Sequence, residues 1–268
     1  MFLHAKYGKI PMEDTYMEYI RFGTGQRILV MLPGLGDSLR SMKGTALPVA
    51  MMYRLFAKDF TVYVFARKRK LQEGYSIREM AKDQVLAMDS LGISKADVFG
   101  VSMGGMIAQH LALDFPEKVN KLVLAVTAAK PNDILNASIT EWIDCAQRED
   151  HTAFMDSNLR RIYSDAYCRK NRWMVPLLGK LTKPKTYDRF FVQADACLGH
   201  NAHDDLPKLR CPTFVIGGEQ DKVLTGEASR EIAGQIPNAQ LLLYPQWGHG
   251  LYEEAKDFNR QVLDFLLE

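Results

Sequence analysis

The chain of 268 residues is predicted to form an α/β fold, with a mostly parallel eight-stranded sheet, helices on both faces and a helical insertion. Three observations predict this class. Short apolar runs, typical of strands buried on both faces, alternate with segments of helical periodicity in the first half of the chain. This alternation stops at about residue 130 and resumes after about residue 205. The length suits one large α/β domain that carries an insertion.

Eight segments have the composition of strands. The first two alternate between apolar and polar residues and are joined by a turn, which is typical of neighbouring antiparallel strands. The others are continuous apolar runs bounded by turn residues. The predicted strands span about residues 3–10, 15–22, 27–32, 60–65, 96–101, 119–126, 212–218 and 240–244.

Helices are predicted between these strands. The strongest signal begins at Ser76, because Glu79 follows three residues later and completes a capping box ahead of an amphipathic segment. Because helices separate successive buried strands, the sheet is expected to be parallel. The other predicted helices span about residues 46–57, 106–113, 227–235 and 251–267.

Residues 130–205 are predicted to form a helical cap over a core domain made of residues 1–129 and 206–268. Residues 133–155 and 157–178 carry helix-like spacing, and no buried strand is predicted between them.

The stretch Gly100-Val101-Ser102-Met103-Gly104 lies between a predicted strand and a predicted helix. Glycines on both sides of Ser102 relieve crowding in so sharp a turn. A G-x-S-x-G sequence in a strand-turn-helix context is the signature of an exposed nucleophilic serine. Ser102 is therefore the candidate nucleophile.

A serine nucleophile needs a base that takes its proton and a third group that orients the base. His249 follows the last predicted strand, and Asp221 follows the strand before it. In a parallel sheet the loops after successive strands open at one edge, so Ser102, Asp221 and His249 are expected to converge there. The loop Pro33-Gly34-Leu35-Gly36 opens at the same edge, and the N–H groups of Leu35 and Met103 are the candidate oxyanion donors.

These motifs resemble those of the α/β-hydrolase superfamily, in the branch of small serine esterases, lactonases and haloperoxidase-like proteins with a helical cap. The resemblance covers nearly the whole chain. It implies Ser102 as nucleophile, Asp221 as orienting acid and His249 as base, in that chain order. It also implies an oxyanion hole formed by the N–H groups of Leu35 and Met103. The expected activity is that of a carboxylesterase-like serine hydrolase that cleaves a small ester or lactone through an acyl-enzyme.

Other reactions use the same residues, so an aminopeptidase or amidase and a C–C bond hydrolase are alternatives. An aminopeptidase is expected to present carboxylates from its cap, and Glu141, Asp144, Glu149 and Asp150 leave this open. An alternative of another class is a ligand-binding, receptor-like protein on a hydrolase scaffold. The residues proposed to line an apolar substrate pocket are Met51, Met52, Trp142, Phe154 and Trp173.

Several classes are excluded by composition and charge. The net charge of +2 predicts no nucleic-acid partner. The N-terminus lacks the apolar run of a signal peptide, and no segment approaches the length of a membrane span. A cytoplasmic protein with a small-molecule substrate, without a membrane partner, is expected as a monomer or homodimer. No cofactor is predicted, and no metal either, since His200 and His203 lack the helical i, i+4 spacing.

The basic run Arg67-Lys68-Arg69-Lys70 follows the fourth predicted strand, near the candidate active-site edge. A solvated loop is one interpretation. Recognition of an anionic substrate group is the other, and residues 159–190 of the predicted cap, with nine Lys or Arg against two Asp, support it. A preference for anionic esters is the resulting secondary prediction.

Overall fold

The computed structural model describes residues 3–268, so Met1 and Phe2 at the start of the N-terminal stretch considered for a signal peptide lie outside it. It confirms the predicted fold class. Eight strands form one sheet in the order β1-β2-β4-β3-β5-β6-β7-β8, in which β1 and β2 are antiparallel to their neighbours and the strands from β4 to β8 run parallel. The strands are β1 Lys6–Met12, β2 Thr15–Phe22, β3 Arg27–Leu32, β4 Phe60–Lys68, β5 Ala96–Val101, β6 Val119–Ala125, β7 Thr213–Gly218 and β8 Gln240–Tyr244.

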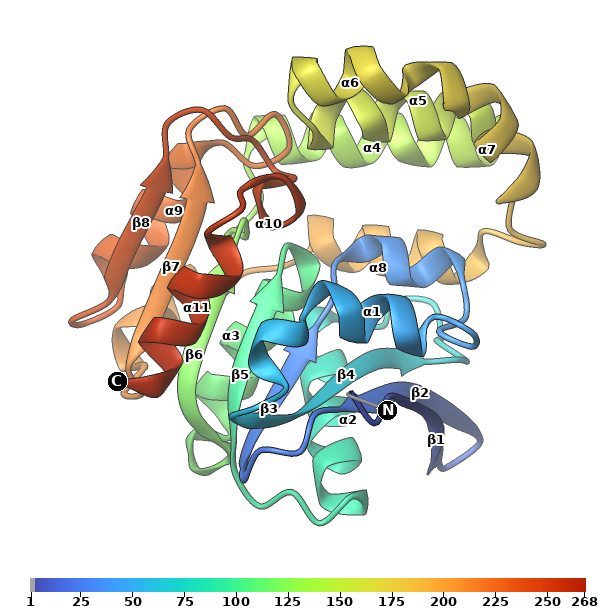
Figure 1. Ribbon diagram of the computed structural model, residues 1–268. Helices are drawn as coiled ribbons and strands as arrows, with labels where there is room; N and C mark the ends of the chain where they lie inside the picture. The colour runs from blue at the N-terminus through green and yellow to red at the C-terminus, as the bar shows by residue number, and fades with distance from the viewer. Residues whose placement is uncertain (1–2) are drawn as a thin grey trace.

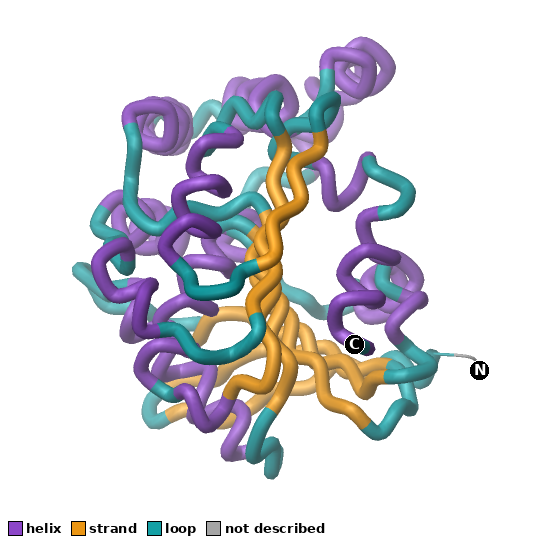
Figure 2. The backbone as a smooth tube through the Cα atoms, turned by 90° about the vertical axis from the view of Figure 1, so that its left-hand side faces the viewer, coloured by secondary structure: helices purple, strands orange, loops and turns teal. Residues whose placement is uncertain are grey.

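Helices cover both faces of the sheet, as Figure 2 shows with the sheet seen edge-on. Two hydrophobic cores result, one on each face. Residues of α2 (Ile77–Ser90), α3 (Met103–Asp114) and α9 (Gly226–Gln235) belong to one core. Residues of α1 (Ala46–Met52) and α11 (Phe258–Leu267) belong to the other. The apolar strand runs therefore bury side chains on both sides, as their composition predicts.

The helices between β6 and β7 lie beyond the carboxyl ends of the strands (Figure 1). The expected long helical stretches are divided, because polar side chains cap new helices inside them. Asp150 and Ser164, which lie inside the stretches, each accept a hydrogen bond from a backbone N–H at a helix start, as Asn132 does ahead of the first of these helices. These helices are α4 Asp133–Gln147, α5 His151–Ile162, α6 Asp165–Asn171, α7 Val175–Leu181 and α8 Asp188–Leu198.

The expected single helix over residues 251–267 is also divided. Here α10 (Leu251–Glu254) ends at Ala255, whose backbone is extended, and α11 follows. Leu251, Ala255 and Phe258 are all buried in the same core, so both helices pack on the same face of the sheet. Among residues 3–268 no helix is long and apolar enough to cross a membrane.

Candidate active site

Ser102 occupies a strained turn between β5 and α3. Its backbone has φ 55° and ψ −122°, a conformation that L-residues rarely adopt outside functional turns. The neighbouring glycines make the turn possible. A Cβ on Gly104 would overlap the carbonyl oxygen of Leu32, and one on Gly100 would lie 2.7 Å from the Cα of Gly105. The G-x-S-x-G spacing is thus dictated by close backbone approaches.

The structure brings Ser102, His249 and Asp221 together although they are far apart in sequence. His249 Nε2 lies 3.0 Å from Ser102 Oγ, and His249 Nδ1 lies 2.8 Å from Asp221 Oδ2. The other carboxylate oxygen of Asp221 accepts hydrogen bonds from the N–H groups of Val223 and Leu224, at 2.7 and 2.9 Å. Both the imidazole and the carboxylate are buried. This arrangement can orient the imidazole and remove a proton from the serine hydroxyl.

The loops that carry Asp221 and His249 are joined to each other by their backbones. The N–H of Gln220 donates to the carbonyl oxygen of Trp247 at 3.0 Å. A Cβ on Gly218 would lie 2.8 Å from the carbonyl oxygen of Gly248, so the two loops also touch. The separation of the imidazole and the carboxylate is therefore fixed by main-chain contacts.

The loop after β3 approaches the serine closely. A Cβ on Gly34 would lie 3.4 Å from the Cβ of Ser102. Within residues 3–268, the N–H groups of Leu35 and Met103 donate to no backbone or side-chain acceptor. Both residues therefore have a free donor beside the nucleophile, as an oxyanion hole requires.

Arg67 holds this loop from the neighbouring strand β4. Its side chain is buried with 1% of its surface exposed, and its Nη2 donates to the carbonyl oxygens of Pro33, at 2.6 Å, and Gly34, at 2.9 Å. The Asp37 carboxylate lies 3.8 Å from Arg67 and 4.0 Å from Arg189 of α8. Burial lowers the pKa of both guanidinium groups, and Asp37 opposes that shift. Both interpretations of the basic run are wrong for Arg67, because packing between β4 and the loop removes it from solvent.

Other members of the basic run also have partners. Lys68 lies 3.6 Å from Asp83, and Lys70 forms an exposed ion pair with Asp14 at 2.6 Å. Neither they nor Arg67 line the cavities described next. The predicted preference for anionic esters therefore loses this support.

Two cavities meet at the loop Pro33-Gly34-Leu35-Gly36, here called the oxyanion loop. The first, here called the nucleophile cavity, has a volume of about 230 Å³ and contains Ser102 and His249. The second, here called the α1 pocket, has a volume of about 310 Å³ and lies between the sheet and α1. Gly34, Gly36 and Tyr252 line both of them. The two cavities are therefore adjacent.

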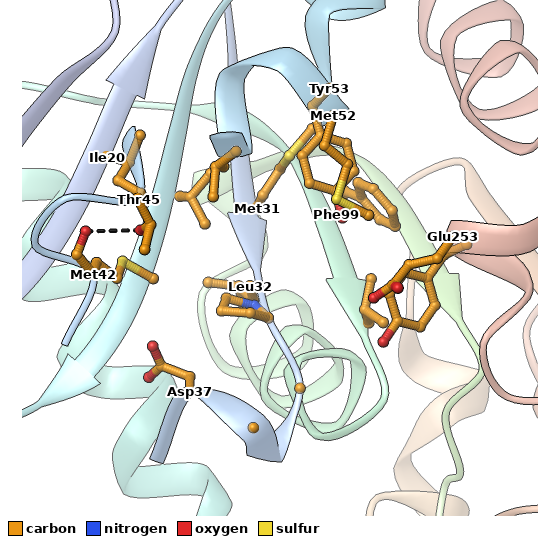
Figure 3. A pocket seen from close by; sticks show the side chains of 17 residues that line it. Ile20, Met31, Leu32, Asp37, Met42, Thr45, Met52, Tyr53, Phe99 and Glu253 are labelled. Carbon is orange, nitrogen blue, oxygen red and sulfur yellow. Dashed lines mark hydrogen bonds between the residues drawn. The ribbon is translucent and has the colours of Figure 1, made fainter. Parts of the chain in front are cut away.

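The proposed pocket residues divide between these cavities. Trp142 and Phe154 line the nucleophile cavity, and Met52 lines the α1 pocket (Figure 3). The structure contradicts the proposal for the other two residues. Trp173 is 75% exposed, and Met51, 48% exposed, lines a separate surface hollow. Neither side chain lines the nucleophile cavity or the α1 pocket, which residue type alone does not reveal.

Sequence reasoning missed several residues that line the cavities. Asn158, Tyr163 and Phe190 line the nucleophile cavity from the helical segment, and Glu253 lines the α1 pocket. For Glu253 a signal existed, since it comes four residues after His249 at the same edge of the sheet. The remaining three residues are identified only by the packing of the helices.

The carboxylates considered for amine recognition point elsewhere. Glu141 forms ion pairs with Arg160, at 3.5 Å, and with Arg161, at 2.5 Å. Glu149 pairs with Lys183 at 3.0 Å, and Asp150 caps α5. Neither these groups nor Asp144 line the two cavities.

The histidines near residue 200 have structural partners. His200 is buried against His110 with their ring centroids 5.2 Å apart, and burial lowers the pKa of His200 to about 3. His203 lies 2.9 Å from Asp204 and 3.0 Å from Glu231. In the part of the chain that the structure describes, no three His, Cys, Asp or Glu side chains are placed to hold a metal ion.

Comparison with protein families gives a match to the alpha/beta hydrolase fold over residues 27–256. Among similar curated proteins is a putative carbamate hydrolase RutD from Caulobacter sp. (strain K31). It is 27% identical over 201 residues, which cover 74% of this chain and 75% of that protein. Another is a 2-hydroxy-6-oxononadienedioate/2-hydroxy-6-oxononatrienedioate hydrolase from Pseudomonas sp. It is 27% identical over 264 residues, which cover 91% of this chain and 89% of that protein.

Among solved structures, MGS-M2 is similar to this chain with a TM-score of 0.87. It is an alpha/beta hydrolase enzyme from a Medee basin deep-sea metagenome library. The two sequences are 24% identical, and the alignment covers 97% of this chain and 98% of MGS-M2. At this identity the likeness concerns the fold.

Proposed function

The chain belongs to the α/β-hydrolase family, and from that premise we propose that it is a serine hydrolase that cleaves a small carboxylic ester or lactone through Ser102. The observation that carries the proposal is the continuous hydrogen-bonded series from Ser102 through His249 to Asp221. It ends in a carboxylate whose second oxygen is held by two backbone N–H groups.

In the proposed reaction Ser102 Oγ attacks the substrate carbonyl carbon while His249 Nε2 takes the hydroxyl proton. Asp221 accepts from Nδ1–H and stabilises the imidazolium. The N–H groups of Leu35 and Met103 donate to the oxyanion. Collapse of the tetrahedral intermediate breaks the bond to the alcohol, which leaves with the proton from His249. Water, activated by the same imidazole, then attacks the acyl-enzyme and releases the acid and Ser102.

The helical segment 130–205 is proposed to act as a cap on a core made of residues 1–129 and 206–268. Trp142, Phe154 and Phe190 of this segment form one wall of the nucleophile cavity. The segment also contacts the loop that carries the base, because the N–H of Gly250 donates to the carbonyl oxygen of Ile162 at 2.6 Å.

A second candidate is cleavage of a C–N bond, as in a carbamate or amide, with the same three residues. The likeness to a curated protein named as a putative carbamate hydrolase favours it. The geometry around Ser102 suits attack on the carbonyl of an ester or of a carbamate or amide.

The test is a burst assay with p-nitrophenyl esters of increasing acyl length, alongside matched carbamates and anilides. We expect a burst close to one equivalent of enzyme with an ester, and a loss of turnover of at least about 10³-fold in Ser102→Ala. Ser90→Ala, which changes an exposed serine on α2, is the control and is expected to keep full activity. Undiminished turnover in Ser102→Ala would refute the nucleophile. Ser102-dependent turnover of carbamates alone would favour the second candidate, and saturable binding without turnover would favour the receptor-like alternative.

A further inference from the structure

Glu253 places a carboxylate in the α1 pocket. It lies in α10, four residues after His249, and its accessible side chain lines the pocket together with Tyr53 and Phe99. Figure 3 shows the carboxylate directed from α10 toward the space beside Leu32. An acidic group therefore faces a cavity whose other walls are mostly apolar.

Among residues 3–268, the Glu253 carboxylate has no positively charged partner. Within residues 3–268, no Lys, Arg or His side chain lies within 4.0 Å of Glu253. Its Oε2 accepts a hydrogen bond from the hydroxyl of Tyr163 at 2.8 Å, whereas Oε1 accepts none from the described residues. Loss of surrounding water raises the pKa of Glu253, the Tyr163 hydroxyl opposes this shift, and the neighbouring Glu254 adds to it. A carboxylate that lines a cavity without a cationic partner attracts a cationic ligand.

The second acidic residue of the pocket differs in this respect. Asp37 also lines the pocket, but Arg67 and Arg189 lie within 4.0 Å of its carboxylate. Glu253 thus carries the uncompensated negative charge among the described residues that line the cavity. Aromatic rings of Tyr53 and Tyr252 form the adjacent wall. A carboxylate beside aromatic faces is a combination that favours ammonium groups.

We propose that the α1 pocket is a subsite for a protonated amine, with Glu253 as the residue that recognises it. This inference rests on the proposed function. The two cavities share Gly34, Gly36 and Tyr252 as lining residues. In this proposal one substrate occupies both of them, with its carbonyl at Ser102 and its ammonium group at Glu253. The substrate class is an ester or lactone whose acyl part carries an amine.

Binding tests the subsite without hydrolysis. Calorimetric titration of the Ser102→Ala protein at pH 7 compares hexylamine with 1-hexanol, which has the same length without the charge. We expect the amine to bind about tenfold more tightly, as a charge-assisted hydrogen bond allows. Glu253→Gln in the same background is expected to remove this difference, because its amide keeps an acceptor for Tyr163 but no charge. Equal binding of the two compounds, or an unchanged ratio in Glu253→Gln, would overturn the proposal.

Turnover then tests specificity. With otherwise wild-type protein, kcat/KM for methyl 6-aminohexanoate is expected to exceed that for methyl 6-hydroxyhexanoate by about tenfold, and Glu253→Gln is expected to equalise them. Glu254→Gln makes the same charge change one residue later, outside the pocket lining, and is expected to keep the ratio. Tyr163→Phe keeps the carboxylate and is expected to keep the preference for the amine. Ser102-dependent hydrolysis without that preference would overturn the subsite and leave the proposed function standing. Amine binding without ester turnover would overturn the proposed function and leave the subsite standing.

Discussion

The edge of the sheet and the helical segment above it are built in different ways. At the edge, Ser102, His249 and Asp221 are held by backbone hydrogen bonds and close glycine contacts, and the two partners of the serine are buried. The helices α4–α8 instead pack through side chains such as Phe154, Tyr187 and Phe190, carry exposed ion pairs on their outer surface and leave Trp173 outside the fold. Buried backbone contacts fix atoms to within tenths of an ångström, whereas exposed ion pairs contribute little to stability. We infer that the edge determines the chemistry and that the helices determine which substrates fit.

The sharpest contrast is expected between two Asp→Asn substitutions. Asp221→Asn should lower kcat by about 10⁴-fold, because an amide donates toward Nδ1 and favours the wrong imidazole tautomer. Asp165→Asn, in α6, removes an exposed ion pair with Lys222 and should change kcat less than twofold. Steady-state kinetics of both variants, with melting temperatures as a folding check, make the comparison. Similar losses of kcat in the two variants would contradict the inference that the edge of the sheet, and not the helical segment, determines the chemistry.

Arg67 and Arg172 provide a second pair. Arg67→Met removes both hydrogen bonds to the oxyanion loop, so kcat should fall by about 10- to 100-fold with a smaller change in KM. Arg172→Met removes an exposed ion pair with Asp156 on the helical segment and should leave both constants unchanged. The readout is the split between kcat and KM. A fall in thermal stability without a change in kcat would show that Arg67 is structural only.

A third comparison concerns two glycines. Gly104 lies at a close backbone approach, whereas Gly234 lies in a helix with open space beside it. Gly104→Ala should destabilise the fold by about 1–3 kcal/mol, because its Cβ would meet the Leu32 carbonyl oxygen. Gly234→Ala in α9 has open space around its Cβ and should stabilise the fold by about 0.5–1 kcal/mol. Denaturant unfolding of both variants gives the two free energies. Destabilisation of equal size at both positions would count against the argument for the turn.

The smallest difference in kinetics is expected between substitutions of the two tryptophans of the helical segment, Trp142 and Trp173. Trp142→Phe enlarges the nucleophile cavity, so longer acyl esters should gain in kcat/KM over short ones by about 1 kcal/mol, or roughly fivefold. Trp173→Phe changes an exposed side chain and should leave this ratio unchanged. An acyl-length series on both variants measures it. A change of this ratio in Trp173→Phe alone would show that the substrate contacts the outer surface of the helical segment and not the nucleophile cavity.

The order of the strands along the chain, the turn at Ser102 and the candidates Asp221 and His249 follow from the sequence by itself. These features depend on apolar periodicity and on motifs of a few residues, which are local properties of the chain. Chain order then places Asp221 and His249 after neighbouring strands, and parallel topology brings them to one edge. The division into core and cap at residues 130 and 205 stays a prediction.

Tertiary structure alone decided what faces the cavities. Arg67 reads as part of a solvated basic run, yet it is buried against a loop that is 33 and 34 residues away along the chain. Glu253 meets Tyr163 across 90 residues, and Trp173 lies outside although Trp142 lies inside. Exposure and charge compensation depend on which distant segments pack together, and neither property is encoded in the residue type or in its local spacing.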